Sequence, residues 1–234
     1  MDKYFDISYF WGAFPVLLPF LKITFLFVGS SALLGFGIGL LVAIMKLSKN
    51  RLIQQLAHLY TTILRCTPSI VLLFLVYYGI PALAKLVHID LNDLETMYFV
   101  IIAFSLQFGA IMSEVIRSAY LSIDKGQYEA AVCVGLSPFQ AYRRIIVPQA
   151  VVTAMPNIGN GLISLLQEGA LAYTIGFIDI VGKAELIIAS NYNTHALEIF
   201  LALAVIYWIL SIVIEQIFIK VEHVFKKGSR SVKV

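Results

Sequence analysis

The sequence predicts an all-α integral membrane protein with five transmembrane helices, and three observations lead to this prediction. Of the 234 residues, 60% are hydrophobic and only 13% are charged. The mean hydropathy of +0.88 excludes an ordinary soluble domain. The apolar residues gather in runs of about 20, the length that a helix needs to cross the hydrocarbon core. The five predicted spans cover about 23–45, 68–87, 97–120, 148 onward with a break near Glu168, and 196–219.

The residues before the first span predict a short helix lying in the outer interface of the membrane. This stretch contains Tyr9, Phe10 and Trp11, and aromatic side chains of this kind are enriched at headgroup level. Pro15 and Pro19 follow before the apolar run begins. The first span is too long for a cleaved signal peptide and lacks a basic leader and a small-residue cleavage site. We therefore expect it to be retained.

Lysine and arginine residues in the short loops predict the orientation of the chain, because basic loops stay in the cytoplasm. The basic residues of the loops after spans one and three and of the final tail are Lys46, Lys49, Arg51, Arg65, Lys125, Arg143, Arg144, Lys220, Lys226, Lys227, Arg230 and Lys233. The opposite side is acidic, with Asp2, Asp6, Asp90, Asp93 and Glu95. The N-terminus is therefore expected outside and the C-terminus in the cytoplasm. The formal net charge of +3 is attributed to this topology and not to nucleic-acid binding.

The connection between the third and fourth spans, about 124–147, is longer than the few residues that such a link needs. Residues 127–134 are predicted to form a helix, followed by Gly135 in the left-handed backbone conformation that often ends helices. Ser137 suits the N-cap of a second helix and Pro138 its first position. The first helix has a stripe of small residues with one aromatic: Tyr128, Ala131, Val132 and Gly135. The pattern favours a docking surface, and an interfacial helix that only caps the bundle is the alternative.

The same segment resembles the EAA signature of ABC importer permeases. Glu129-Ala130-Ala131 is followed after three residues by Gly135, and after nine more by Ile145-Ile146-Val147-Pro148. The signature reads E-A-A, three residues, G, nine residues, I-x-L-P, so the chain departs from it only at Val147. In that family the segment is the coupling helix, which sits in a groove of the ATP-hydrolysing subunit. The resemblance implies an ATPase-coupling role for Glu129, Ala130, Ala131 and Gly135.

Three further segments resemble the polar amino-acid permeases among these importers. They are "RCTPSIVLLFLVYYGIP" (65–81), "SEVIRSAYLSIDKGQYEAA" (113–131) and "PNIGNGLISLLQEGALAYTIGFIDI" (156–180). The resemblance implies the type I ABC importer permease fold, with residues 1–234 as a single transmembrane domain. The largest departure lies where the family has K-D-T-S-L and where substrate is expected to bind. The residues there are Gln167, Glu168, Gly169, Ala170 and Leu171.

Two carboxylates inside the predicted spans are the main candidates for contacting a substrate. Glu114 lies roughly 13 Å above the cytoplasmic end of its span, where a charge is costly, so it should face the bundle interior or a wet cavity. Arg117 stands three residues on and could neutralise it, which is the purely structural interpretation. Glu168 could meet a substrate ammonium group or only hold the helix break against a neighbouring span. Gly169 and Ala170 beside it would leave room for a larger substrate.

Nucleotide binding by the chain itself is not expected, because no Walker lysine motif is present. The run "GFGIG" lies inside the first span, where Gly35 and Gly39 indicate close helix packing. Cys66 and Cys133 fall on the cytoplasmic side, where thiols stay reduced, and no metal-ligand spacing is present. No disulfide, metal or cofactor is therefore expected, and ATP and Mg would be bound by the partner ATPase.

The resemblance implies a permease subunit, not an enzyme, in the bacterial inner membrane. It would form half of the pathway of a binding-protein-dependent importer. The implied partners are an ATP-binding subunit dimer, a second permease chain, an extracellular solute-binding protein, the lipid bilayer and an amino-acid substrate. Cystine or another polar amino acid is favoured, with a basic amino acid or an opine as the alternative. A different class is an ATP-independent channel or an intramembrane enzyme. The enzyme has no catalytic motif to support it, and neither needs a groove-filling cytoplasmic helix.

Overall fold

A computed structural model describes residues 5–91 and 93–229, and the elements in this part of the chain are all helical. In chain order they are α1 (Ile7–Leu17), η1 (Leu18–Phe20), α2 (Leu21–Lys46), α3 (Arg51–Cys66), α4 (Ser69–Leu86), α5 (Thr96–Leu121), α6 (Lys125–Cys133), α7 (Pro138–Ala141), η2 (Tyr142–Ile146), α8 (Val147–Glu168), η3 (Gly169–Ile175), α9 (Ile180–Ser190) and α10 (Ala196–Ser229). The predicted all-α class is confirmed. Asp2, Arg230 and Lys233 lie outside the described residues.

Four segments of the described chain are long and apolar enough to cross a membrane. They are Ile7–Lys46, Ser69–Leu86, Thr96–Leu121 and Ala196–Phe225. The fourth of the five predicted spans coincides with α8, a helix of 22 residues. This helix is not among the four segments. Gln149, Asn157 and Asn160 lower its mean hydropathy. The count of five spans therefore stays a prediction.

The predicted helix before the first span is present as α1, but it is not separate from that span. α1, η1 and α2 follow one another directly and form one apolar segment of 40 residues. Asp6 caps α1, because its carboxylate accepts hydrogen bonds from the hydroxyl and backbone N–H of Ser8 at 2.6 and 2.8 Å. These bonds lower the pKa of Asp6. The position of α1 at the membrane interface stays a prediction.

The expectation of a loop between the first two spans is wrong, because most of it forms the amphipathic helix α3. Asn50 caps this helix by accepting the N–H of Leu52 at 2.9 Å. The Tyr60 hydroxyl donates to the backbone oxygen of Leu106 at 2.7 Å, which fastens α3 to α5. Lys46 is also not a loop residue: it ends α2, and its side chain is fully buried.

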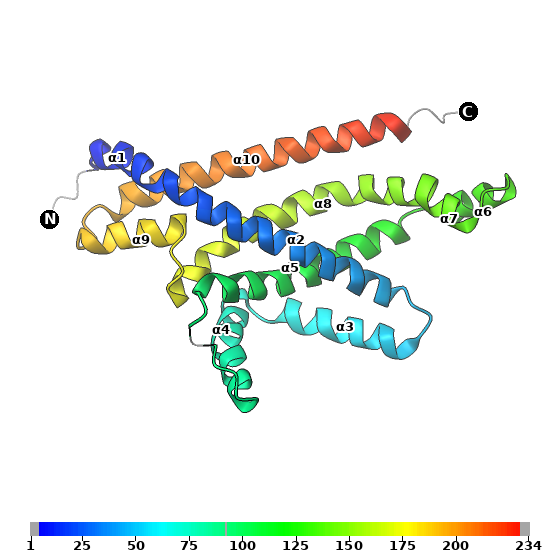
Figure 1. The fold of residues 1–234 in the computed structure, drawn as a ribbon. Helices are drawn as coiled ribbons and strands as arrows, with labels where there is room; N and C mark the ends of the chain where they lie inside the picture. Colours follow the sequence, from blue (N-terminus) through cyan, green and yellow to red (C-terminus); the bar gives the residue numbers. More distant parts are fainter. Residues whose placement is uncertain (1–4, 92, 230–234) are drawn as a thin grey trace.

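Close approach of α2 and α5 forms the centre of the bundle, where the two helices cross (Figure 1). A Cβ atom at Gly35 would lie 2.8 Å from the backbone oxygen of Ser105, and one at Gly39 would lie 2.8 Å from the Cβ of Met112. The predicted role of these glycines in helix packing is confirmed. The buried core around this contact includes Phe27, Leu73, Phe104, Met112 and Leu166.

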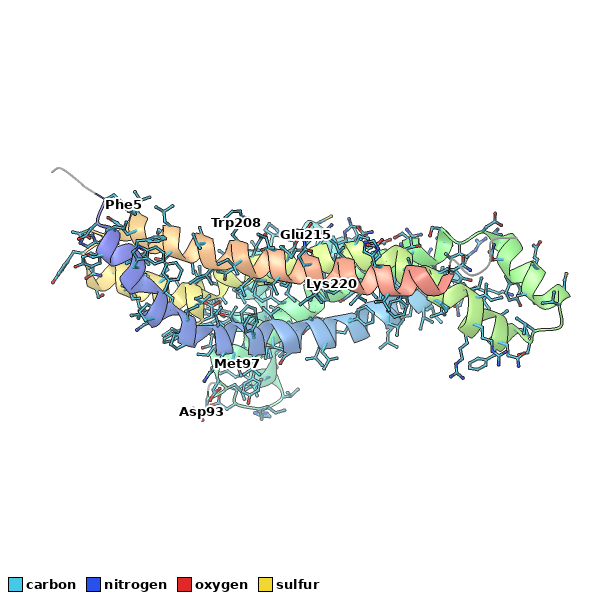
Figure 2. All side chains as sticks on the ribbon, turned by 90° about the horizontal axis from the view of Figure 1, so that it is seen from above. Phe5, Asp93, Met97, Trp208, Glu215 and Lys220 are labelled. Carbon is cyan, nitrogen blue, oxygen red and sulfur yellow. The ribbon has the colours of Figure 1, made fainter. Side chains whose placement is uncertain are left out.

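The bundle is elongated, with α6 and α7 at one end and α1 and α9 at the other (Figure 1). In the view from above, Trp208, Glu215 and Lys220 follow one another along α10 toward the end that holds α6 and α7 (Figure 2). The basic C-terminal part of α10 and the predicted cytoplasmic segment therefore approach the same end. The sequence does not predict α9. The buried Asp179 caps this helix, because its carboxylate accepts the N–H groups of Val181 and Gly182.

Candidate coupling segment and translocation cavity

The turn after α6 has the geometry that the sequence predicts. Gly135 has a φ of +88°, in the left-handed region. Its N–H donates to the oxygen of Val132 at 2.9 Å, and the N–H of Leu136 donates to the oxygen of Ala131 at 3.1 Å. These two bonds satisfy carbonyl groups that the end of the helix would leave free. Because a Cβ atom at Gly135 would have no heavy atom within 4 Å, only the backbone conformation requires glycine here.

The second helix of the segment begins as predicted, at Pro138. The Ser137 hydroxyl accepts the N–H of Gln140 at 3.3 Å, and the Gln140 side chain accepts the N–H of Ser137 at 2.9 Å. This reciprocal capping box fixes where the helix starts. α7 then passes through the π-helical turn η2 directly into α8. The segment at the end of the bundle is therefore joined to α8 by continuous helix.

The predicted small-residue stripe is divided between the bundle and the surface. Tyr128 and Ala131 turn inward, and the Tyr128 ring lies 5.3 Å from that of Tyr142. Val132 and Gly135 are exposed, so these two members of the stripe are the ones open to a partner. The end of the bundle exposes apolar side chains beside the polar Glu129: Val132, Val134 at 78% and Phe139 at 71%. An apolar patch of this kind, rimmed by polar residues, is typical of an interaction site.

Glu114 is held by two cations. Lys46 Nζ lies 2.6 Å from Glu114 Oε1, and Arg117 Nε lies 2.9 Å from Oε2. Lys46 also donates to the Ser113 hydroxyl at 3.1 Å. The predicted pairing with Arg117 is confirmed, whereas the sequence does not predict the pairing with Lys46, because its basic neighbours indicate a loop there. The carboxylate is therefore neutralised by the chain itself.

Glu168 is the last residue of α8, where the predicted break occurs. The helix gives way to the 3-10 helix η3, which ends at Ile175 and is followed by Gly176 with a φ of +82°. The Glu168 side chain is half-buried, and its Oε2 accepts the hydroxyl of Ser69 at 3.1 Å. Gln107 Nε2 in turn donates to that hydroxyl oxygen at 2.7 Å. A short polar chain thus connects α5, the start of α4 and the end of α8.

One cavity brings both candidate carboxylates together. Its volume is about 410 Å³, and it is lined by Arg65, Gln107, Ile111, Glu114, Val115 and Glu168. Its walls come from α3, α5 and α8. From the sequence alone Arg65 is only a topology signal, because nothing in a single sequence indicates that the end of α3 reaches the end of α8.

The other predicted substrate residues lie outside the lining of this cavity. Gln167 is exposed, Ala170 packs on a second core cluster near α9 and α10, and Leu171 packs on the main core. A Cβ atom at Gly169 would lie 2.1 Å from Cζ of Phe27. The expectation that Gly169 leaves room for substrate is therefore wrong, because the ring of Phe27 occupies that space.

Comparison with known protein families gives a match over residues 35–221 to the binding-protein-dependent transport system inner membrane component. The chain belongs to this family. The L-cystine transport system permease protein TcyL of Bacillus subtilis is 39% identical over 228 residues, which are 97% of this chain and 95% of the relative. The nopaline transport system permease protein NocM of Agrobacterium fabrum is 35% identical over 215 residues, 91% of this chain and 88% of the relative.

Solved structures show the same architecture. An amino acid ABC transporter crystallised with histidines matches with a TM-score of 0.80 at 27% identity, over 94% of this chain and 99% of the other. The inward-facing MetNI methionine transporter matches with a TM-score of 0.68 at 20% identity, over 90% and 96% of the two chains, and shows the fold alone. The resemblance to amino-acid ABC importer permeases is thereby confirmed. The chain has the all-helical fold of type I importers and is a transport subunit, and ATP hydrolysis resides in separate subunits of such importers.

Proposed function

We propose that this chain forms half of the translocation pathway for a polar amino acid, with cystine as the first expectation. The observation that carries this proposal is the cavity at the end of α8, where a carboxylate stands at a helix break inside the bundle. Broken helices at cavities are a common way to hold small charged substrates. The relatives include a cystine permease and a nopaline permease, so an opine or a basic amino acid is the alternative.

Residues 124–147 act in this proposal as the joint to the ATPase. The exposed apolar patch of Val132, Val134 and Phe139 docks into the ATP-binding subunit, beside Glu129, Ala130 and Ala131. This patch favours an ATP-driven importer over a channel or an intramembrane enzyme, because neither of these needs a docking helix. The partners bind ATP and Mg, and this chain carries no cofactor. A second permease chain completes the pathway, and an extracellular binding protein delivers the substrate.

A single helix connects the two sites. α8 is about 33 Å long at 1.5 Å per residue; it starts at the coupling segment and ends at Glu168. A displacement of α6 and α7 that follows ATP binding is therefore carried along α8 to the cavity wall. In a five-span pathway this displacement would alternate the access of the cavity between the two sides of the membrane.

The substrate is tested with the cognate solute-binding protein, by measuring ligand-dependent melting across the twenty amino acids and cystine. A bound ligand stabilises the folded binding protein, and the stabilisation grows with the logarithm of the ligand concentration divided by Kd. The true substrate should therefore raise the melting temperature of the binding protein most. We expect that shift with cystine. A larger shift with arginine, or with nopaline added to the set, would replace cystine with the alternative class.

The orientation is tested by cysteine labelling. Cys66 and Cys133 are both free and exposed, so the background must lack them. Single cysteines placed at Asp93 and at Lys125 should then differ in their labelling by an impermeant maleimide. In intact cells only the cysteine at position 93 should react. Labelling at Lys125 and protection at Asp93 would place the coupling segment outside and remove the basis of the docking proposal.

A further inference from the structure

The charged groups that line the cavity differ in what already neutralises them. Glu114 has Lys46 and Arg117 on its two oxygens. Arg65 forms no ion pair with any residue in the described ranges 5–91 and 93–229. Glu168 likewise has no cation partner there and accepts only the Ser69 hydroxyl. The cavity is therefore lined by one positive group, on the exposed Arg65, and one negative group, on the half-buried Glu168, and no residue in those ranges neutralises either.

The hydrogen bonds around Ser69 settle which end of the Gln107 amide is free. Ser69 has a single hydroxyl hydrogen, and it donates this hydrogen to Glu168. Its oxygen can therefore only accept from Gln107, which requires the Nε2 group of the amide to face it, at 2.7 Å. Oε1 is consequently the group that points elsewhere.

Gln107 Oε1 is a buried acceptor without a partner among the described residues. The residue is only 9% exposed, it lines the cavity, and no hydrogen bond reaches this oxygen. A buried polar atom left unsatisfied costs free energy, so such an atom on a residue that lines a cavity indicates a ligand donor or an ordered water. An ammonium group beside Glu168 would supply a donor.

We propose that the cavity recognises both ends of an amino acid. The guanidinium of Arg65 takes the α-carboxylate, and Glu168 together with Gln107 Oε1 takes the α-ammonium group. The planar guanidinium matches a carboxylate with two parallel hydrogen bonds. An ammonium group has three hydrogens to share between a carboxylate and an amide oxygen. Glu114 is then a structural ion pair and leaves the set of substrate ligands.

The shape of the cavity suits this assignment. Its volume of about 410 Å³ lies within the range usual for small-molecule sites. Ile111 and Val115 stand one helical turn apart on α5 and give it an apolar wall. A substrate fixed by its two charged ends would lay its side chain against such a wall. The inference rests on the proposed function. It adds the requirement that the substrate has an unblocked amino group and an unblocked carboxyl group.

The test compares Arg65→Gln with Arg65→Lys and with a matched control, Arg51→Gln, at the other end of the same helix. The complete importer is reconstituted in liposomes, and the probe is the radiolabelled amino acid that gives the largest melting shift with the binding protein. Uptake by Arg65→Gln should fall at least tenfold, while the ATPase activity stimulated by the loaded binding protein stays within twofold. Arg65→Lys should retain more uptake because it keeps the charge, and the control should match the unmodified importer.

The outcomes separate this inference from the proposed function. If Glu168→Gln lowers uptake but Arg65→Gln leaves it within twofold, the assignment of Arg65 is overturned and the cavity stands. If neither variant lowers uptake, the cavity is not the substrate site and both proposals fail. Loss of uptake together with loss of the stimulated ATPase would assign Arg65 to assembly and would also overturn the inference.

Discussion

Replacing Glu168 with glutamine is expected to lower substrate uptake at least about tenfold, which corresponds to about 1.4 kcal/mol. The amide keeps the size of the side chain, and its oxygen can still accept the hydroxyl of Ser69. The connection between α8 and the start of α4 therefore survives in the variant. Only the negative charge is lost, so a drop in uptake would report the interaction with the ammonium group.

Uptake by Glu168→Gln is measured in proteoliposomes at equal membrane abundance, with the stimulated ATPase activity as a second readout. Glu185→Gln on α9 is the matched control, because this carboxylate does not line the cavity. The ATPase activity should stay near that of the unmodified importer. Uptake within twofold of that importer would show that the carboxylate only holds the helix break, and the substrate proposal would lose its main residue.

Local chemistry made the backbone of residues 124–147 predictable. Gly135 permits the left-handed conformation, Ser137 and Pro138 favour the start of a helix, and each position has the conformation expected of it. The break at Glu168 was predictable for a related reason, since Gly169 and Ala170 follow directly after a polar pair. These signals depend on neighbours in the sequence and need no knowledge of the packing.

Contacts between distant helices were the part that the sequence did not reveal. Lys46 stands next to other basic residues, so a loop was the natural expectation, whereas its partner Glu114 lies on another helix. Arg65 reaches the same cavity as Glu168 only because α3 packs on α5. At Gly169 the sequence shows a missing side chain, but only the structure shows that Phe27 fills the space.

The helix α3 was missed because charges at its two ends concealed its periodicity. Arg51 and Arg65 indicated a cytoplasmic loop, while Ala57, Thr61 and Leu64 lie between them at helical spacing and are buried. For α8, by contrast, the sequence predicts a helix that the hydropathy criterion for a membrane span does not include. Its position was predicted, but its asparagine and glutamine residues keep it below the hydropathy of the four apolar segments.

Replacing Gly135 with valine is expected to abolish transport while leaving the protein in the membrane. A β-branched residue at a φ of +88° is strained by about 1–3 kcal/mol. No heavy atom would contact the new Cβ, so the effect arises from the backbone alone. Relief of this strain would rearrange the turn between α6 and α7 and displace the exposed patch of Val132, Val134 and Phe139 from the ATPase groove that we propose for it.

Two matched variants isolate the backbone effect. Gly135→Asn should retain most activity, because asparagine tolerates the left-handed conformation. Gly37→Val should also be active, since Gly37 is exposed on α2, has open space around it and lies in regular helix. If Gly37→Val were as damaging as Gly135→Val, the loss would reflect a general effect of valine and not the turn.

The central claim is that this chain is a transport subunit joined to a separate ATPase through residues 124–147. The most direct test is to measure ATPase co-purification and ATP-dependent uptake together for Gly135→Val at equal membrane abundance. We predict that both are lost in Gly135→Val and retained in Gly135→Asn. Normal uptake with normal ATPase association in Gly135→Val would contradict the claim.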